Sequence, residues 1–221
     1  MTKAVIFDMY ETLITHYRCP LYFGKQMAAD AGISEDKFRE SWSPTEYDRS
    51  IGKMTLEDAI EIVLVHNKCY SKELLDTIVR KRIDIKEEGF RHIHTDIIPL
   101  FESLKKKGIK IGLISNCFSE EAEVIEKSIL YPYFDAVCLS YREGIVKPDT
   151  EIFTRCIDRL NVKAEECLYV GDGGSQELEA ASALGMQVLQ AVWYFIEDGR
   201  KQGFKQVEKP FDLMGYLNSF G

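Results

Sequence analysis

Residues 4–13 of the chain read AVIFDMYETL, a short apolar run that stops at Asp8. A continuous apolar run of this length is typical of a strand buried on both faces in a parallel sheet. Ligands of open α/β sheets bind just beyond the carboxyl ends of such strands, which is where Asp8 stands. The carboxylate is therefore a candidate nucleophile or metal ligand. An Asp that caps a following helix would produce the same local pattern, and this stretch alone does not separate the two.

Three later segments repeat the pattern of an apolar or turn-forming run that leads to polar side chains. The first is IKIGLI at residues 109–114, and the second is the Lys-Pro pair at 147–148, where Pro suits a helix start. The third is CLYVG at 167–171, which leads into an acidic, glycine-rich turn and then a helix. Taken singly, each segment also fits an ordinary turn or helix entry. The polar residues that these segments contribute are Ser115, Asn116, Lys147, Asp172 and Glu177.

In chain order, these segments resemble the four motifs of the haloacid dehalogenase-like hydrolase superfamily. The resemblance extends from Asp8 to Glu177 and so covers most of the chain. It implies an α/β fold whose core is a doubly wound parallel sheet of Rossmann-like type. It also implies that an all-helical cap domain is inserted between the first and the second motif.

The pattern along the chain agrees with that arrangement. Residues 16–94 show helical periodicity with almost no β-branched runs, whereas helix and strand patterns alternate from residue 96 onward. Repeated βα units with short connections favour a parallel sheet with right-handed crossovers. We therefore expect a core domain of residues 1–15 and 95–221 and a helical cap domain of residues 16–94.

Length, charge and cysteine content are those of an ordinary globular protein and exclude several classes of partner. A chain of 221 residues with 45% hydrophobic content suffices for one α/β domain and a smaller insert. A net charge of −8 repels nucleic acid and anionic lipid, so we expect neither as a partner. Six cysteines without a CxxC pair argue against a metal finger or a disulfide framework. With no signal peptide and no membrane-length apolar stretch, we expect a cytoplasmic monomer or homodimer.

The resemblance implies a role for each polar residue near the expected sheet edge. Asp8 is the implied nucleophile, whose carboxylate attacks phosphorus and forms an aspartyl-phosphate. Lys147 would neutralise charge on the transferred group and keep Asp8 ionised. Ser115 and the backbone amide of Asn116 would donate hydrogen bonds to the phosphoryl oxygens, and Thr12 would support that geometry. The implied substrate is a small phosphorylated metabolite.

The same resemblance implies a Mg²⁺ cofactor, because an anionic nucleophile that attacks an anionic phosphate needs a cation between them. Mg²⁺ prefers oxygen ligands and retains several waters, so it needs few protein carboxylates. The implied ligands are Asp8, Asp172 and the backbone carbonyl of Tyr10. Glu177 would orient metal-bound water or these ligands. Glu177 equally fits a structural role, because an acid in the first turn of a helix interacts favourably with the helix dipole.

One residue departs from the phosphatase pattern. The phosphatases of the superfamily usually carry a second Asp two residues after the nucleophile, as general acid and base. This chain has Tyr10 there, followed by Glu11 where glycine is usual. A phenol with a pKa near ~10 donates a proton but is a poor base at neutral pH. Tyr at this position resembles the 2-haloacid dehalogenases, in which Asp attacks carbon, halide leaves without a proton and no metal is used.

Three functions therefore stay open. The first is a Mg²⁺-dependent phosphatase, which Asp172 favours because the dehalogenases generally lack an acid at that position. The second is a metal-free 2-haloacid dehalogenase, which Tyr10 favours, with Arg39 as a candidate halide-binding cation. A solvated charge on an amphipathic helix explains Arg39 more simply. The third is a catalytically weak binding or regulatory module that keeps the fold without the acid/base. We expect the first.

Overall fold

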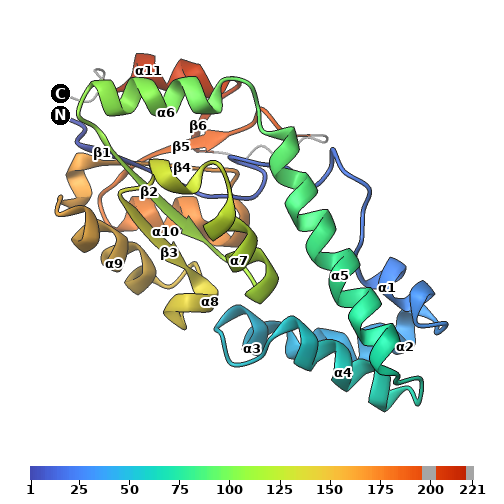
Figure 1. The fold of residues 1–221 in the computed structure, drawn as a ribbon. Helices are drawn as coiled ribbons and strands as arrows, with labels where there is room; N and C mark the ends of the chain where they lie inside the picture. Colours follow the sequence, from blue (N-terminus) through green and yellow to red (C-terminus); the bar gives the residue numbers. More distant parts are fainter. Residues whose placement is uncertain (196–202, 218–221) are drawn as a thin grey trace.

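A six-stranded sheet forms the centre of the molecule in the computed structural model, which describes residues 1–195 and 203–217 (Figure 1). All its neighbouring strands are parallel and follow the order β3-β2-β1-β4-β5-β6. The strands are β1 (Ala4–Phe7), β2 (Lys110–Ser115), β3 (Ala136–Leu139), β4 (Cys167–Gly171), β5 (Gln187–Ala191) and β6 (Lys205–Val207). The predicted fold class, an α/β doubly wound sheet, is confirmed.

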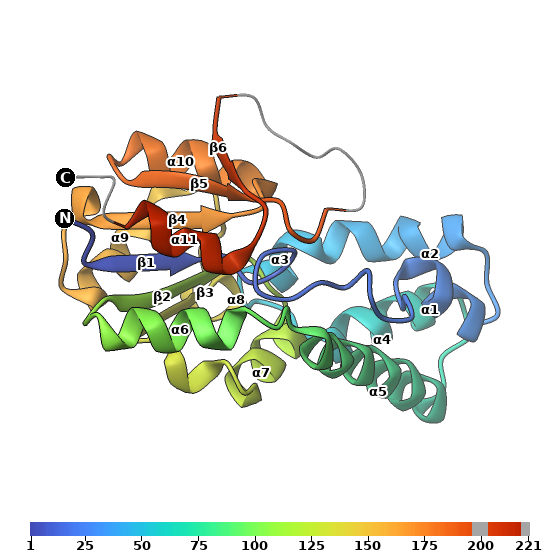
Figure 2. The same ribbon diagram turned by 90° about the horizontal axis from the view of Figure 1, so that it is seen from above.

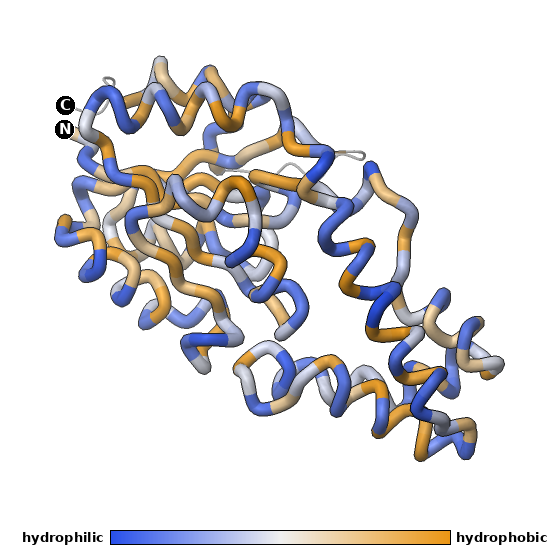
Figure 3. Tube along the Cα trace, in the orientation of Figure 1, coloured by the Kyte–Doolittle hydropathy of each residue, from blue (hydrophilic) through white to orange (hydrophobic). Residues whose placement is uncertain are grey.

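Helices cover both faces of this sheet because its strands are apolar on both sides. Along β1, Val5 and Phe7 face one layer of the core, and Ala4 and Ile6 face the other. The first layer is covered by α6 (Ile97–Lys106), α7 (Ser119–Lys127) and α11 (Leu213–Tyr216). The second is covered by α9 (Thr150–Leu160) and α10 (Glu177–Ala183), and the short α8 (Ser140–Glu143) follows β3. Figure 3 shows the resulting hydrophobic interior of the sheet.

The strand order reverses beside β1, and this reversal positions the site. From β1 the chain proceeds to β2 and β3 on one side and then crosses back to β4 on the other. Connections that leave in opposite directions open a crevice at the carboxyl ends of β1 and β4. The residues that directly follow these two strands are Asp8 and Asp172.

Five helices between β1 and β2 form a separate bundle with its own apolar core. They are α1 (Gly24–Asp30), α2 (Glu35–Trp42), α3 (Glu46–Ser50), α4 (Leu56–His66) and α5 (Lys72–Gly89). The helix starts follow from capping, since Ser34 accepts from Lys37 N and Thr55 accepts from Asp58 N. Phe38, together with residues of α4 and α5, fills the bundle interior. Figure 2 shows the bundle beyond the carboxyl ends of the strands.

Short 3₁₀ turns complete the described structure. They are η1 (Ser43–Thr45), η2 (Phe90–His92), η3 (Tyr131–Tyr133), η4 (Ala164–Glu166), η5 (Gly174–Gln176) and η6 (Pro210–Asp212). The described residues include no helix with the length and apolar character needed to cross a membrane.

Candidate active site

Three carboxylates meet at the carboxyl edge of the sheet. Asp8 directly follows β1, Asp172 directly follows β4, and Glu177 opens α10. One oxygen of each carboxylate lies within 4.8 Å of the others. Asp8 and Glu177 are buried, and Asp172 is half-buried. The sheet brings Asp8 and Asp172 together because β1 and β4 are adjacent parallel strands that end at the same edge.

Lys147 is the cation that faces these three carboxylates. Its Nζ lies 2.5 Å from Asp8 Oδ1 and also pairs with Glu177, and its side chain is only 3% exposed. The side chain of Asn116 accepts from Lys147 N at 2.8 Å and donates to Lys147 O at 3.1 Å. The Asn116 side chain therefore fixes the lysine loop to the end of β2, a role that the sequence did not reveal.

The charges of this cluster do not balance. Burial and the nearby Glu177 raise the pKa of Asp8 well above its usual value, against the lowering effect of Lys147. Burial and Glu177 also raise the pKa of Asp172 to about 6. Burial alone would lower the pKa of Lys147, but Asp8 and Glu177 raise it, so the ammonium stays charged. Within the described residues of this cluster, three carboxylates share one ammonium, and such an excess of hard oxygen ligands suits a divalent cation.

Both oxygens of Glu177 are already engaged by the protein. Oε2 pairs with Lys147 and accepts from the Tyr169 hydroxyl at 2.9 Å, and Oε1 accepts from Gly173 N at 3.1 Å. Gly171 leaves room for this carboxylate, since a Cβ at that position would lie 2.0 Å from Glu177 Oε1. The geometry thus favours a role for Glu177 in positioning Lys147, rather than a role as a direct ligand of a metal ion.

The polar residues at the end of β2 lie at the same edge. β2 pairs with β1 so that Leu113 stands opposite Phe7, which places Ser115 one position beyond the level of Asp8. Ser115 is fully buried, and its Oγ donates to Asn116 O at 3.4 Å. The structure therefore brings Ser115 and Asn116 to the edge that carries the three acids and Lys147, as the motif order predicts.

The loop after Asp8 is held by its own side chains and by the C-terminal part of the core. Thr12 Oγ1 donates to Asp8 Oδ2 at 3.5 Å, and Trp193 Nε1 donates to Thr12 O at 2.8 Å. Glu11 adopts a left-handed φ of 57°, which explains why glycine suits this position. Its carboxylate accepts from Thr15 Oγ1 at 2.5 Å and so turns back onto its own loop.

The phenol of Tyr10 lies toward the helical bundle. Its ring stacks on His16 with ring centroids 4.5 Å apart, and Lys86 Nζ lies 5.4 Å from the Tyr10 ring centroid. The buried hydroxyl has no hydrogen-bond partner among the described residues. Burial and the nearby Glu121 raise the pKa of this phenol well above its usual value, so it stays protonated at neutral pH.

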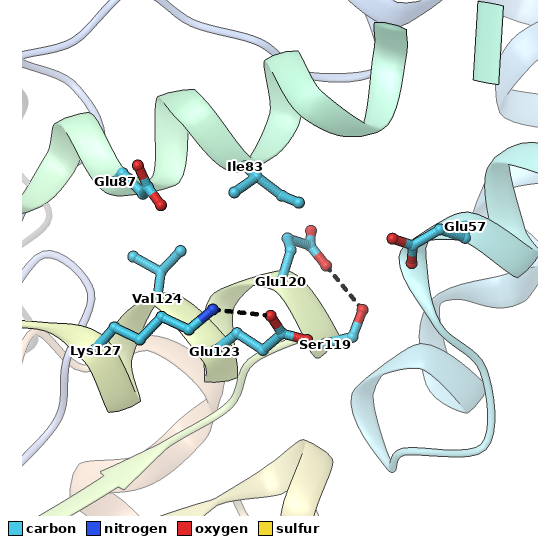
Figure 4. Close-up of a pocket in the computed structure, with 8 residues that line it drawn as sticks. All are labelled: Glu57, Ile83, Glu87, Ser119, Glu120, Glu123, Val124 and Lys127. Carbon is cyan, nitrogen blue, oxygen red and sulfur yellow. Dashed lines mark hydrogen bonds and ion pairs between the residues drawn. The ribbon is translucent and has the colours of Figure 1, made fainter. Parts of the chain in front are cut away.

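Buried ion pairs join the bundle to the core beside Tyr10. Lys86 Nζ of α5 lies 2.5 Å from Glu121 Oε1 of α7, and Arg82 Nε lies 3.2 Å from Glu120 Oε1. Ser119 Oγ donates to Glu120 Oε2 at 3.3 Å beside a small pocket of about 60 Å³ between α4, α5 and α7 (Figure 4). Sequence reasoning missed these residues, because each is an ordinary charge on an amphipathic helix until α5 meets α7.

A larger cavity of about 750 Å³ lies between the bundle and the core. Tyr10 and Asn116 line its core side, and Arg49 lines its bundle side. Arg39 also lines the cavity, but its side chain is 66% exposed and pairs with Glu35 at 3.0 Å. Arg39 is therefore a solvated charge in this structure, whereas Arg49, which the sequence did not single out, is buried.

Comparison with known proteins identifies relatives over nearly the full length. The family model described as haloacid dehalogenase-like hydrolase matches residues 2–185. The chain is 27% identical over 210 residues to the glyceraldehyde 3-phosphate phosphatase of Methanocaldococcus jannaschii, a match that covers 90% of each chain. It is 27% identical over 226 residues to the phosphorylated carbohydrates phosphatase of Thermotoga maritima, covering 97% of this chain and 98% of the relative.

Solved structures share the fold. A HAD phosphatase from Thermococcus onnurineus superposes with a TM-score of 0.70 at 24% identity over 98% of both chains. The L-2-haloacid dehalogenase RSc1362 superposes with a TM-score of 0.62 at 17% identity, also over 98% of both chains. The matched residues of the family model include Lys147 and all three carboxylates of the acidic cluster. The chain belongs to the haloacid dehalogenase-like hydrolases.

Proposed function

We propose that the chain is a Mg²⁺-dependent phosphatase that acts on a small phosphorylated metabolite. The observation that carries the proposal is the acidic cluster of Asp8, Asp172 and Glu177 around the ammonium of Lys147. Two relatives that match nine-tenths or more of the chain are named as phosphatases of glyceraldehyde 3-phosphate and of phosphorylated carbohydrates. Their names support the same class of reaction.

In the proposed reaction, an oxygen of Asp8 attacks phosphorus and the bond from phosphorus to the ester oxygen breaks. This step forms an aspartyl-phosphate and divides one difficult displacement into two easier ones. Water then attacks the phosphorus, which releases phosphate and restores the Asp8 carboxylate. Lys147, which already lies beside Asp8, neutralises charge on the transferred group. Ser115 and the backbone amide of Asn116 are the proposed donors to the phosphoryl oxygens, and Thr12 supports Asp8.

Asp8, Asp172 and the backbone carbonyl of Tyr10 are the proposed protein ligands of Mg²⁺. Burial and the negative charge of Glu177 raise the pKa values of Asp8 and Asp172, so a cation that binds both carboxylates would stabilise their charged form. Oxygen ligands are those that this ion prefers. Bound Mg²⁺ supplies positive charge that lowers the repulsion between the carboxylate and the phosphate. Glu177 is proposed to hold Lys147 in place at the edge of the metal site.

The leaving ester oxygen needs a proton, and Tyr10 occupies the position of the usual general acid. Its raised pKa keeps the phenol protonated, so Tyr10 has a proton to give but is a weak acid, and the neutral phenol is unsuited to remove a proton from water. We therefore propose Tyr10 as the proton donor to the leaving group. A phosphatase with this donor hydrolyses esters of good leaving groups most readily, because those groups depart without a proton.

We further propose that residues 16–94 act as a cap domain over a core of residues 1–15 and 95–221. The cavity between the two is large enough for a small metabolite, and a cap that closes over it excludes water from the reaction. The acidic net charge supports a small-molecule substrate over nucleic acid or a membrane surface. A cytoplasmic monomer or homodimer fits this proposal.

A metal-free 2-haloacid dehalogenase is the second candidate, and Tyr10 is the observation that favours it. Such an enzyme releases halide without a proton and therefore needs no second Asp. The acidic cluster argues against it, because Asp172 beside Asp8 leaves two carboxylates with raised pKa values in a site that lacks a metal. We rank this candidate second for that reason.

Turnover of phosphate esters and of 2-chloropropionate, each in Mg²⁺ and in EDTA, tests the proposal. We expect phosphate release that requires Mg²⁺ and no release of chloride. Asp8→Asn should abolish turnover, because the amide keeps the side-chain volume and lacks the nucleophilic charge. Asp149→Asn is the matched control, since Asp149 is exposed, caps α9 and can be replaced by an equally good capping residue. Chloride release that is indifferent to EDTA would favour the dehalogenase, and an active Asp8→Asn variant would remove Asp8 from the nucleophilic role.

A further inference from the structure

Two buried hydrogen-bond donors that line the large cavity lack an acceptor among the described residues. One is Arg49 Nη1 on the cap side, and the other is the hydroxyl of Tyr10 on the core side. Buried polar groups in folded proteins are nearly always paired, and leaving one unpaired is costly. Both donors can therefore take an acceptor that enters the cavity from outside.

Arg49 is held rigidly in the wall of this cavity. Its guanidinium lies between two rings, 3.8 Å from the ring centroid of Trp42 and 4.2 Å from that of Phe118. Its Nε donates to Thr45 Oγ1 at 2.9 Å. Burial lowers the pKa of Arg49 to about 10, so the side chain is still a cation at neutral pH. A guanidinium stacked on both faces presents its remaining N–H groups only at its edge.

The other buried cations of the cavity already have carboxylate partners. Lys86 pairs with Glu121 and Arg82 pairs with Glu120, whereas no described carboxylate lies within ion-pair distance of Arg49. Five basic and three acidic side chains line the cavity, and Glu120 beside Arg82 makes a fourth acid, so positive charge still exceeds negative charge by one although the chain as a whole carries a net charge of −8. This local excess of positive charge favours an anionic occupant.

We propose that Arg49 binds a second anionic group of the substrate, a carboxylate or a phosphate remote from the phosphoryl group that reacts. The proposal rests on the proposed phosphatase function, in which the reacting end lies past Tyr10 and Asn116 on the core side of the cavity. The edge of a guanidinium matches the oxygens of either anion, and the rings of Trp42 and Phe118 shield that contact from water. The preferred substrates are therefore small phosphate monoesters that carry a second acidic group.

Two pairs of matched esters test this inference. Phosphoglycolate and its amide share the phosphate ester and differ in whether the other end is a carboxylate or a neutral amide. Ethylene glycol bisphosphate and 2-hydroxyethyl phosphate differ in whether the other end is a second phosphate or a neutral hydroxyl. The wild-type protein should prefer the charged member of at least one pair by about ten- to a hundredfold in kcat/KM, the range of a charge-assisted hydrogen bond. The pair that shows the preference identifies the anion as carboxylate or phosphate.

Variants of two arginines that line the same cavity separate binding from structure. Arg49→Gln should bring the kcat/KM values of the two members of a pair to within a few fold of each other. Arg49→Lys, which keeps the charge without the planar fork, should retain part of the preference. Arg39→Gln is the control, because Arg39 is solvated and already paired with Glu35, and it should leave the preference unchanged.

Two results would overturn the inference. The first is a wild-type protein with the same kcat/KM for both members of each pair, with and without the second anionic group. The second is an Arg49→Gln variant whose kcat/KM falls by the same factor for both members of a pair. Arg49 would then have a structural role, in the packing of Trp42 and Phe118. Calorimetric titration of Asp8→Asn in Mg²⁺ with phosphoglycolate and its amide measures the same preference without turnover. A protein that hydrolyses none of the esters refutes the proposed phosphatase, whereas this titration still decides whether the cavity selects an anion.

Discussion

Protonation of His16 should weaken the folded state at mildly acidic pH. The imidazole stacks on Tyr10, and its Nε2 lies 3.1 Å from the ammonium of Lys86. A protonated ring would place two cations at that distance, although Glu121 lies nearby and opposes the effect. Burial and Lys86 together lower the pKa of His16 from 6.5 to about 3. Because the unfolded chain binds this proton and the folded chain does not, stability present above pH 6.5 is lost as the pH falls toward 3.

Each pH unit inside that window costs about 1.4 kcal/mol, so the loss at pH 5 is about 2 kcal/mol. Urea denaturation of the wild-type protein and of His16→Gln in EDTA measures it as a difference between the two proteins. Asp8 and Asp172 have raised pKa values, so their protonation stabilises the folded state as the pH falls, which is the opposite of the effect of His16. Both proteins share this contribution, so it cancels in the difference between them. The stability advantage of the wild type should shrink by about 2 kcal/mol from pH 7 to pH 5. An advantage that is the same at both pH values would refute this account of His16.

Mg²⁺ should bind more tightly as the pH rises through about 6, because Asp172 must first lose its proton. Calorimetry at pH 5 and pH 7 checks this, and Asp172→Asn should weaken binding at both. Tyr10→Asp should raise kcat/KM for alkyl phosphates by about 10²-fold and for p-nitrophenyl phosphate much less, since only the alkoxide needs a proton. Kinetics with both esters decides the point, and a variant that slows both alike would refute Tyr10 as the proton donor, because another residue would then have to supply the proton. Arg82→Met should lower the free energy of unfolding by about 3–5 kcal/mol, because buried Glu120 loses its cation. Urea denaturation should find the double variant Arg82→Met/Glu120→Gln more stable than Arg82→Met, and the reverse order would contradict the pairing.

The strands of the core could be predicted from short apolar runs because a parallel sheet buries both faces of each strand. β1 and β4 coincide with the apolar runs that precede Asp8 and Asp172, and β2 lies one residue beyond the run at residues 109–114. β6 was missed, because Lys205–Val207 is only three residues long and its first residue is exposed. Such a strand is defined by its pairing with β5, which no local pattern encodes.

Asp8, Asn116 and Asp172 could be predicted because each directly follows a strand, and Glu177 could be predicted because it opens a helix. Arg49 could not, because its burial depends on Trp42 of the helical bundle and on Phe118, which meet only in the folded chain. The choice of Arg39 as a candidate cation shows the same limit. Both arginines lie in short polar helices, and only tertiary packing buries one and leaves the other in solvent.

Gly171 carries a consequence for the evolution of this site. It is not among the glycines with a left-handed φ, so its backbone would accept other residues. The carboxylate of Glu177 occupies most of the space of a side chain, and Tyr169 Cε1 would lie 3.1 Å from an added Cβ. Positions 171 and 177 should therefore covary among homologues, with alanine or serine at 171 tolerated only where a shorter side chain replaces Glu177. A larger residue at 171 alone would clash with Glu177, and a shorter residue at 177 alone would leave a void. The two substitutions therefore compensate each other, and neither is neutral by itself.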